Sequence, residues 1–128
     1  MPVVALVVDD SMVIRHTVCR FLEERGYSVE VASNGREALE IASQKLPSLV
    51  ITDMQMPTMS GGELITALKS KPETAGIPIV ILTGHSSGYD RDEARAEFTI
   101  FKDIDIQEQL ERALNALTKK TKAQGSGN

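Results

Sequence analysis

The segment Leu49-Val50-Ile51-Thr52-Asp53 is a short apolar run that ends on a carboxylate, and Met54-Gln55-Met56-Pro57 follows it. A run of this kind, closed by a polar residue and a turn, predicts a buried β-strand. In an open parallel sheet, ligands bind at the carboxyl ends of the strands, so an acid placed there is available for chemistry. Asp53 is therefore the first candidate functional residue.

Four more segments are predicted strands, and three of them also end on a polar or charged residue. Continuous apolar runs are typical of strands that are covered on both faces, as in a parallel sheet. Residues 28–32 instead alternate between polar and apolar side chains, which predicts an exposed or edge strand. Two apolar runs are Val3–Val8 before Asp9 and Asp10, and Ile79–Leu82 before Thr83; Phe98–Phe101 before Lys102 is the last predicted strand.

Helical periodicity separates these strands. The alternation of five strands with five helices predicts an α/β fold, a doubly wound five-stranded parallel sheet with right-handed crossovers. The predicted helices cover residues 11–25, a segment that starts at Asn34, one that starts with a capping box of Ser60 and Glu63, a short one from Asp90, and residues 105–117. A loop bracketed by Pro72 and Pro78 is expected before the fourth strand. One domain is therefore predicted over residues 1–117, followed by a disordered tail at 118–128, which lacks apolar periodicity.

Composition limits the class of protein. The 128 residues are 41% hydrophobic and 25% charged, which is ordinary for a globular domain. Cys19 is the single cysteine, no signal peptide is recognisable, and the apolar runs are too short to span a membrane, so a cytoplasmic domain without membrane insertion is expected. The net charge of −4 and the lack of a long Lys/Arg cluster argue against direct nucleic-acid binding.

The residues at the predicted strand ends form a chemically coherent set. Asp9, Asp10 and Asp53 should converge at one edge of the sheet, where three carboxylates repel one another unless a cation relieves them. Mg²⁺ is suited to this role because it binds carboxylates and keeps positions for water and phosphate oxygens. Lys102 and Thr83 are suited to contact phosphoryl oxygens. Asp53 would then be the nucleophile that forms an aspartyl phosphate.

Four motifs in the sequence match one known family in combination. They are Val8-Asp9-Asp10-Ser11, Ile51–Pro57 with Gly61, Ile81-Leu82-Thr83-Gly84, and Phe101-Lys102. With them the sequence resembles, over about residues 3–117, the receiver domain of bacterial two-component response regulators. The resemblance implies a flavodoxin-like fold with strand order 2-1-3-4-5, in which the alternating segment 28–32 is an edge strand.

The resemblance also implies a role for each matching residue and a class of partner. A histidine kinase or phosphotransfer protein would donate the phosphoryl group, and a further protein of unknown identity would read the signal. The domain would catalyse no reaction beyond its own phosphorylation and dephosphorylation. The implied roles are Asp53 as phosphoacceptor, Asp10 as direct Mg²⁺ ligand, Asp9 as a ligand through water, the backbone carbonyl of Gln55 as a further ligand, and Thr83 and Lys102 as phosphoryl contacts.

Three features depart from the family pattern. Thr99 stands three residues before the lysine, where the family usually has an aromatic side chain. Asp103 follows the lysine in place of a proline, so a trans peptide bond is expected there. The separation between Thr83 and Lys102 is a few residues short, which should trim the fourth helix. The loop after Thr83 is therefore expected to report phosphorylation in place of an aromatic switch.

Three other functions are alternatives to this interpretation. A pseudo-receiver would bind partners without phosphorylation, and Thr99 and Asp103 keep that alternative open. An aspartyl-nucleophile phosphatase of the haloacid dehalogenase type would need a second acid two residues after Asp53, where Gln55 stands. A nucleotide or flavin site would need a glycine-rich first turn, which Asp10-Ser11-Met12 does not provide.

Overall fold

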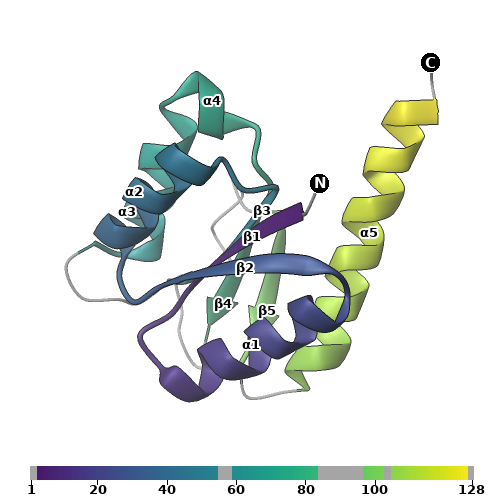
Figure 1. Ribbon diagram of the computed structural model, residues 1–128, viewed down its shortest axis with the longest axis horizontal. Helices are drawn as coiled ribbons and strands as arrows, with labels where there is room; N and C mark the ends of the chain where they lie inside the picture. The colour runs from purple at the N-terminus through teal and green to yellow at the C-terminus, as the bar shows by residue number, and fades with distance from the viewer. Residues whose placement is uncertain (1–2, 55–58, 84–96, 103–104, 127–128) are drawn as a thin grey trace.

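The computed structural model describes residues 3–54, 59–83, 97–102 and 105–126, with the side chains of the last helix described only as far as residue 117 (Figure 1). Its five strands form one parallel sheet in the order β2-β1-β3-β4-β5. This order confirms the predicted doubly wound, flavodoxin-like fold. The strands are β1 (Val3–Val8), β2 (Tyr27–Ala32), β3 (Leu49–Asp53), β4 (Ile79–Thr83) and β5 (Phe98–Phe101).

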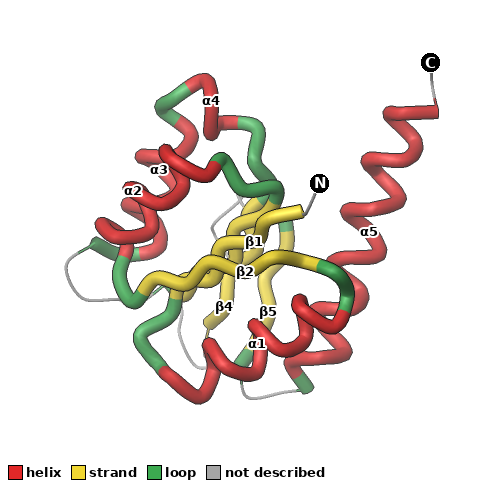
Figure 2. The backbone as a smooth tube through the Cα atoms, in the orientation of Figure 1, coloured by secondary structure: helices red, strands yellow, loops and turns green. Residues whose placement is uncertain are grey.

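Helices cover both faces of the sheet (Figure 2). The helices α1 (Met12–Glu24) and α5 (Ile106–Ser126) pack on one face. The helices α2 (Gly35–Lys45) and α3 (Gly61–Lys69) pack on the other face. A short helix, α4 (Pro72–Ala75), follows α3 and contacts it.

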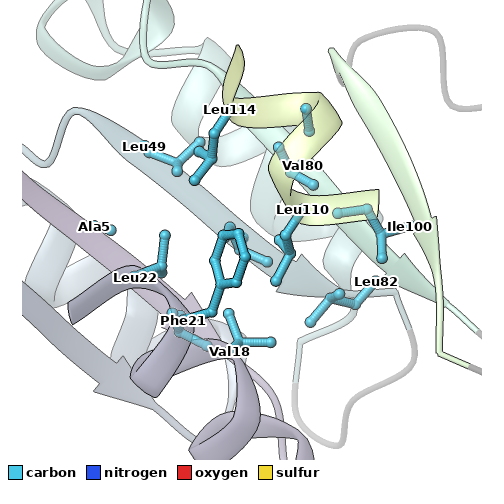
Figure 3. Packing of buried hydrophobic residues seen from close by; sticks show 13 residues of the cluster. Ala5, Val18, Phe21, Leu22, Leu49, Val80, Leu82, Ile100, Leu110 and Leu114 are labelled. Atoms are coloured by element: carbon cyan, nitrogen blue, oxygen red, sulfur yellow. The ribbon is translucent and has the colours of Figure 1, made fainter. Parts of the chain in front are cut away.

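Two apolar layers follow from this arrangement, because alternate residues of each buried strand point to opposite faces. Figure 3 shows the layer under α1 and α5, where Phe21 and Leu22 of α1 meet Leu110 and Leu114 of α5 over the sheet. Leu6, Val50, Ile79 and Ile81 point to the other face and meet Leu64, Ile65 and Leu68 of α3. The central strands β3 and β4 are buried along their whole length, as their continuous apolar sequences predict.

The predicted helix starts agree with the observed caps. The side chain of Asn34 accepts a hydrogen bond from the backbone N–H of Glu37 at 2.9 Å. Ser60 and Glu63 form the predicted capping box, in which each side chain binds the backbone N–H of the other. These bonds satisfy N–H groups that the first turn of a helix leaves without a partner.

The structure departs from the sequence prediction at two places. The segment between Pro72 and Pro78, expected as a loop, contains α4, because proline at the first position of a helix already has a helical φ. The last helix continues to Ser126, nine residues past the expected end at Leu117, so the segment expected to be disordered is largely helical. Lys119, Lys120 and Ala123 are good helix formers, which allows the helix to continue without an apolar face. The helix predicted from Asp90 lies outside the described residues.

None of the helices in the described part of the chain is both long enough and apolar enough to cross a membrane.

Candidate functional site

The sheet register places the ends of β1 and β3 side by side. Val8 of β1 pairs with Thr52 of β3, so the next residues along these strands, Asp9 and Asp53, are neighbours. One carboxylate oxygen from each of Asp9, Asp10 and Asp53 lies within 4.8 Å of the others. The carboxylates of Asp9 and Asp53 are buried, whereas Asp10 is exposed. The cluster therefore has two buried acids and one that faces solvent.

Asp9 is fixed by contacts on both sides of its backbone. Its N–H donates to the carbonyl of Ala32 at the end of β2 (3.1 Å), and its own carbonyl accepts from the guanidinium of Arg15 (3.1 Å). One carboxylate oxygen, Oδ1, accepts from the backbone N–H of Ser11 at 2.8 Å. The other oxygen, Oδ2, has no hydrogen-bond partner among the described residues, although it makes an ion pair.

Lys102 supplies that ion pair and joins two of the acids. Its Nζ lies 2.9 Å from Oδ2 of Asp9 and 2.9 Å from Oδ2 of Asp53. Only the contact with Asp53 also has hydrogen-bond geometry among the described residues. Burial on its own would lower the pKa of the Lys102 ammonium, but contact with the carboxylates of Asp53 and Asp9 outweighs it and raises the pKa above 10.5. Lys102 is therefore charged at neutral pH.

The backbone of Lys102 is set by the end of β4. Thr83 pairs with Phe101 across the two strands, and the N–H of Lys102 donates to the carbonyl of Thr83 at 2.8 Å. Thr83 is itself buried, at 2% exposure. The sheet thus brings Thr83 and Lys102 to the same edge as the three acids.

Gly61 fits closely against the end of β3. Its N–H donates to the carbonyl of Met54 at 3.0 Å, and a Cβ atom at position 61 would collide with the carbonyl oxygen of Asp53. The colliding atoms belong to the backbone and cannot rotate away. A side chain at this position would therefore displace the residue that carries the candidate nucleophile.

Five of the six residues predicted for the site lie among the described residues. The structure brings Asp9, Asp10, Asp53 and Lys102 together and places Thr83 at the same sheet edge. Gln55 and Asp103 lie outside the described residues. Thr99 lies half-buried on β5. The contact of Arg15 with the Asp9 carbonyl could not be predicted, because it depends on a side-chain conformation that no sequence pattern signals.

Comparison with known proteins agrees with this geometry. The family model described as the response regulator receiver domain matches residues 5–115. The chain belongs to the response regulator receiver domain family. It is a domain of two-component signalling.

The curated relatives that match the chain include response regulators. The response regulator MprA of Mycolicibacterium vanbaalenii is 36% identical, over 99% of this chain and 55% of its own length. The chain spans about half the length of the first curated relatives that it matches.

Solved structures show the same fold. The chemotaxis response regulator CheY4 of Vibrio cholerae is 31% identical with a TM-score of 0.79, and the match covers 91% of this chain and 98% of that one. The signal receiver domain of a histidine kinase from Syntrophus aciditrophicus is 33% identical with a TM-score of 0.77, covering 91% of this chain and 90% of that one.

The acidic cluster of this receiver domain fits a hard divalent cation. Three carboxylate oxygens within 4.8 Å of one another are the donors that Mg²⁺ prefers. Asp9 Oδ2 is buried beside the Lys102 ammonium at 2.9 Å, so a cation at the cluster would share this carboxylate with Lys102. The exposure of Asp10 leaves the cluster open to solvent on one side.

Proposed function

We propose that this receiver domain accepts a phosphoryl group on Asp53 from a histidine kinase or phosphotransfer protein in the cytoplasm. The phosphorylated domain would then bind a further protein that carries the signal on. The observation that carries the proposal is the contact of the Lys102 ammonium with the Asp53 carboxylate at 2.9 Å, beside Asp9 and Asp10. This arrangement puts a fixed positive charge beside the carboxylate that would accept the phosphoryl group.

The transfer requires little from the protein beyond position and charge. A carboxylate oxygen of Asp53 attacks the phosphorus of a phosphohistidine, so that an O–P bond forms and the N–P bond breaks. The electron pair of the N–P bond returns to the imidazole nitrogen, which takes a proton from solvent. The Lys102 ammonium balances the charge on the phosphoryl oxygens, and the hydroxyl of Thr83 donates a hydrogen bond to one of them.

Asp9, Asp10 and Asp53, together with the backbone carbonyl of Gln55, would hold Mg²⁺. A bound Mg²⁺ neutralises part of the charge that accumulates when a phosphoryl group approaches three acids. Asp9 and Asp10 follow Val8, the last residue of β1, which pairs with Thr52 of β3, so both acids lie beside Asp53. Asp53, at the end of the fully buried β3, would be the nucleophile.

Phosphorylation by a small donor tests the proposal without a cognate kinase. Incubation with acetyl phosphate and Mg²⁺ should add one phosphoryl group, visible by intact-mass spectrometry and released by hydroxylamine, which cleaves acyl phosphates. Asp53→Asn should abolish the adduct. Asp105→Asn is a matched control, because Asp105 is an exposed acid whose side chain only caps α5, as asparagine can also do. An unmodified wild-type protein, as a pseudo-receiver would give, or an equal adduct on Asp53→Asn, would refute the assignment.

A further inference from the structure

Lys102 follows directly after β5, which is the edge strand of the sheet in the described part of the chain. Among the described strands β5 pairs with β4 alone, because it is last in the strand order, and α5 lies beside it (Figure 1). The N–H of Lys102 points toward β4, where it donates to the carbonyl of Thr83. Backbone groups of successive strand residues point in opposite directions, so the N–H and C=O of Phe101 point to the open edge.

The side chain of Gln109 binds both of these groups. The N–H of Phe101 donates to Oε1 of Gln109 at 3.0 Å, and Nε2 of Gln109 donates to the carbonyl of Phe101 at 2.9 Å. The amide therefore takes the place that a neighbouring strand would have at this residue. The orientation of the amide is determined, because the N–H needs an oxygen acceptor and the C=O needs an N–H donor.

Gln109 is itself held by the first turn of α5. Its backbone N–H donates to the carbonyl of Asp105 at 3.3 Å, and Nε2 makes a second contact with the same carbonyl at 3.2 Å. The carboxylate of Asp105 accepts from the N–H of Glu108, which caps the helix. The paired hydrogen bonds between Gln109 and Phe101 form a clip. This clip connects the start of a long helix to the end of a four-residue strand.

The clip and β4 together fix the strand end from two sides. Phe101 is bound at the open edge and Lys102, the next residue, is bound to Thr83 on the inner side. The residue after Lys102 in the sequence is Asp103, so the fixed φ of a proline does not restrict the backbone there. The end of a short edge strand otherwise opens easily.

We propose that Gln109 is a positioning residue for phosphoryl transfer, because its clip on Phe101 fixes the backbone from which Lys102 reaches Asp53 and Asp9. This inference rests on the proposed function, since it assigns to Lys102 a role in the transfer. Gln109 lies on α5 and does not touch the acids in the described structure. Its effect on the reaction passes through the backbone of Phe101 and Lys102.

The test compares two glutamines of α5. Gln109→Met removes both hydrogen bonds of the clip at similar side-chain length. Gln107→Met is the matched control, because Gln107 is exposed and makes no side-chain hydrogen bond with the described residues. Amide hydrogen exchange at Phe101 and the rate of phosphorylation by phosphoramidate with Mg²⁺ are measured for both. Gln109→Met should raise the Phe101 exchange rate and lower the phosphorylation rate, each by about tenfold or more, as expected when a reacting group is misplaced. Gln107→Met should change neither rate by more than about twofold.

A double variant separates positioning from a general loss of structure. In a Lys102→Ala background, adding Gln109→Met should lower the remaining phosphorylation rate by less than about twofold, because the group to be positioned is gone. An equal loss in both backgrounds would overturn the proposal. Gln109→Glu keeps the acceptor for the Phe101 N–H and serves if the methionine variant does not fold; its rate should lie below that of the wild type.

The two proposals fail differently. A wild-type protein that takes no phosphoryl group refutes the proposed function. A wild type that is phosphorylated at Asp53, with an unchanged rate in Gln109→Met and Gln109→Glu, refutes only the role of Gln109.

Discussion

The ammonium of Lys102 lies 2.9 Å from the carboxylate of Asp53, although 49 positions separate the two residues in the sequence. The same ammonium is 2.9 Å from the fully buried carboxylate of Asp9. One cation from the end of β5 therefore balances two acids from the ends of β1 and β3. Removing Lys102 would leave two carboxylates that repel each other. Removing either acid would leave the Lys102 ammonium with one carboxylate fewer to balance its charge.

The first prediction concerns alkaline pH. The pKa of Lys102 in the folded protein is raised above its ordinary value of 10.5, the carboxylates outweighing the opposite effect of burial. The folded state therefore holds this proton more tightly than the unfolded state does, and its stabilising contribution is present below pH 10.5 and is lost as pH rises through the folded pKa. Lys102→Met should remove that pH dependence.

Urea unfolding at about pH 8 and about pH 11 measures this difference. Between the lower and the higher pH, the free energy of unfolding should fall more for the wild type than for Lys102→Met. Tyr27, whose pKa is raised by burial, is present in both proteins, so its contribution cancels. Replacing the exposed Lys45 by methionine is the control and should behave like the wild type. Equal losses in wild type and Lys102→Met would contradict the prediction.

The strand-end set could be predicted from sequence because the sheet is parallel. Each apolar run ends where its backbone leaves the sheet, and parallel strands all leave at the same edge. Asp9, Asp53, Thr83 and Lys102 could therefore be placed together without knowing any side-chain conformation. The order β2-β1-β3-β4-β5 came from the family resemblance, supported by the alternating pattern of residues 28–32.

Contacts that depend on side-chain conformation or on a single turn could not be predicted in this way. The pairing of Lys102 with Asp9 as well as Asp53 depends on the reach of a flexible side chain. The clip between Gln109 and Phe101 has no sequence signal, because a half-buried glutamine on a helix is ordinary. The helix after Leu117 has no apolar periodicity, so the pattern that marks amphipathic helices was absent there.

A second prediction concerns Mg²⁺. Binding to the folded state alone stabilises a protein by about 2.7 kcal/mol at a hundred times Kd, so Mg²⁺ should raise the melting temperature. Asp10→Ala should remove most of this rise, because it takes away one of the three carboxylates that would bind the cation. Glu40→Ala, which removes an exposed acid from α2, should leave the rise unchanged. Differential scanning calorimetry with and without Mg²⁺ measures both, and an undiminished rise in Asp10→Ala would show that Asp10 is not a ligand.

The third prediction uses the end of α2. Leu46 has φ of 47° and ψ of 64°, the left-handed conformation, and its side chain is 52% exposed. For a residue with a Cβ, the left-handed conformation costs about 1 kcal/mol or more of free energy. Glycine adopts this conformation without that cost, but it loses more conformational entropy on folding. Leu46→Gly should therefore raise the free energy of unfolding, by up to about 1 kcal/mol. Leu46→Ala keeps the unfavourable φ and should not be stabilised, so a glycine variant less stable than the alanine variant would contradict the argument.

The fourth prediction compares two adjacent glycines at the start of α3. A Cβ at position 61 would meet the backbone of Asp53 and Met54, which cannot move without displacing the end of β3. Gly61→Ala should therefore lower the free energy of unfolding by about 3 kcal/mol, the upper range for overpacking, and slow phosphorylation of Asp53.

Gly62 provides the matched control for that change. A Cβ at position 62 would approach only the side chains of Met54 and Ser60, at 3.8 and 3.9 Å, which is ordinary van der Waals contact. Because Gly62 lies within α3, alanine there should gain up to about 1 kcal/mol from its higher helix propensity. Urea unfolding of the two variants should thus give changes of opposite sign from the same added methyl group. Similar stabilities would mean that the backbone at Asp53 yields to a side chain at position 61, and that close packing there does not fix the nucleophile.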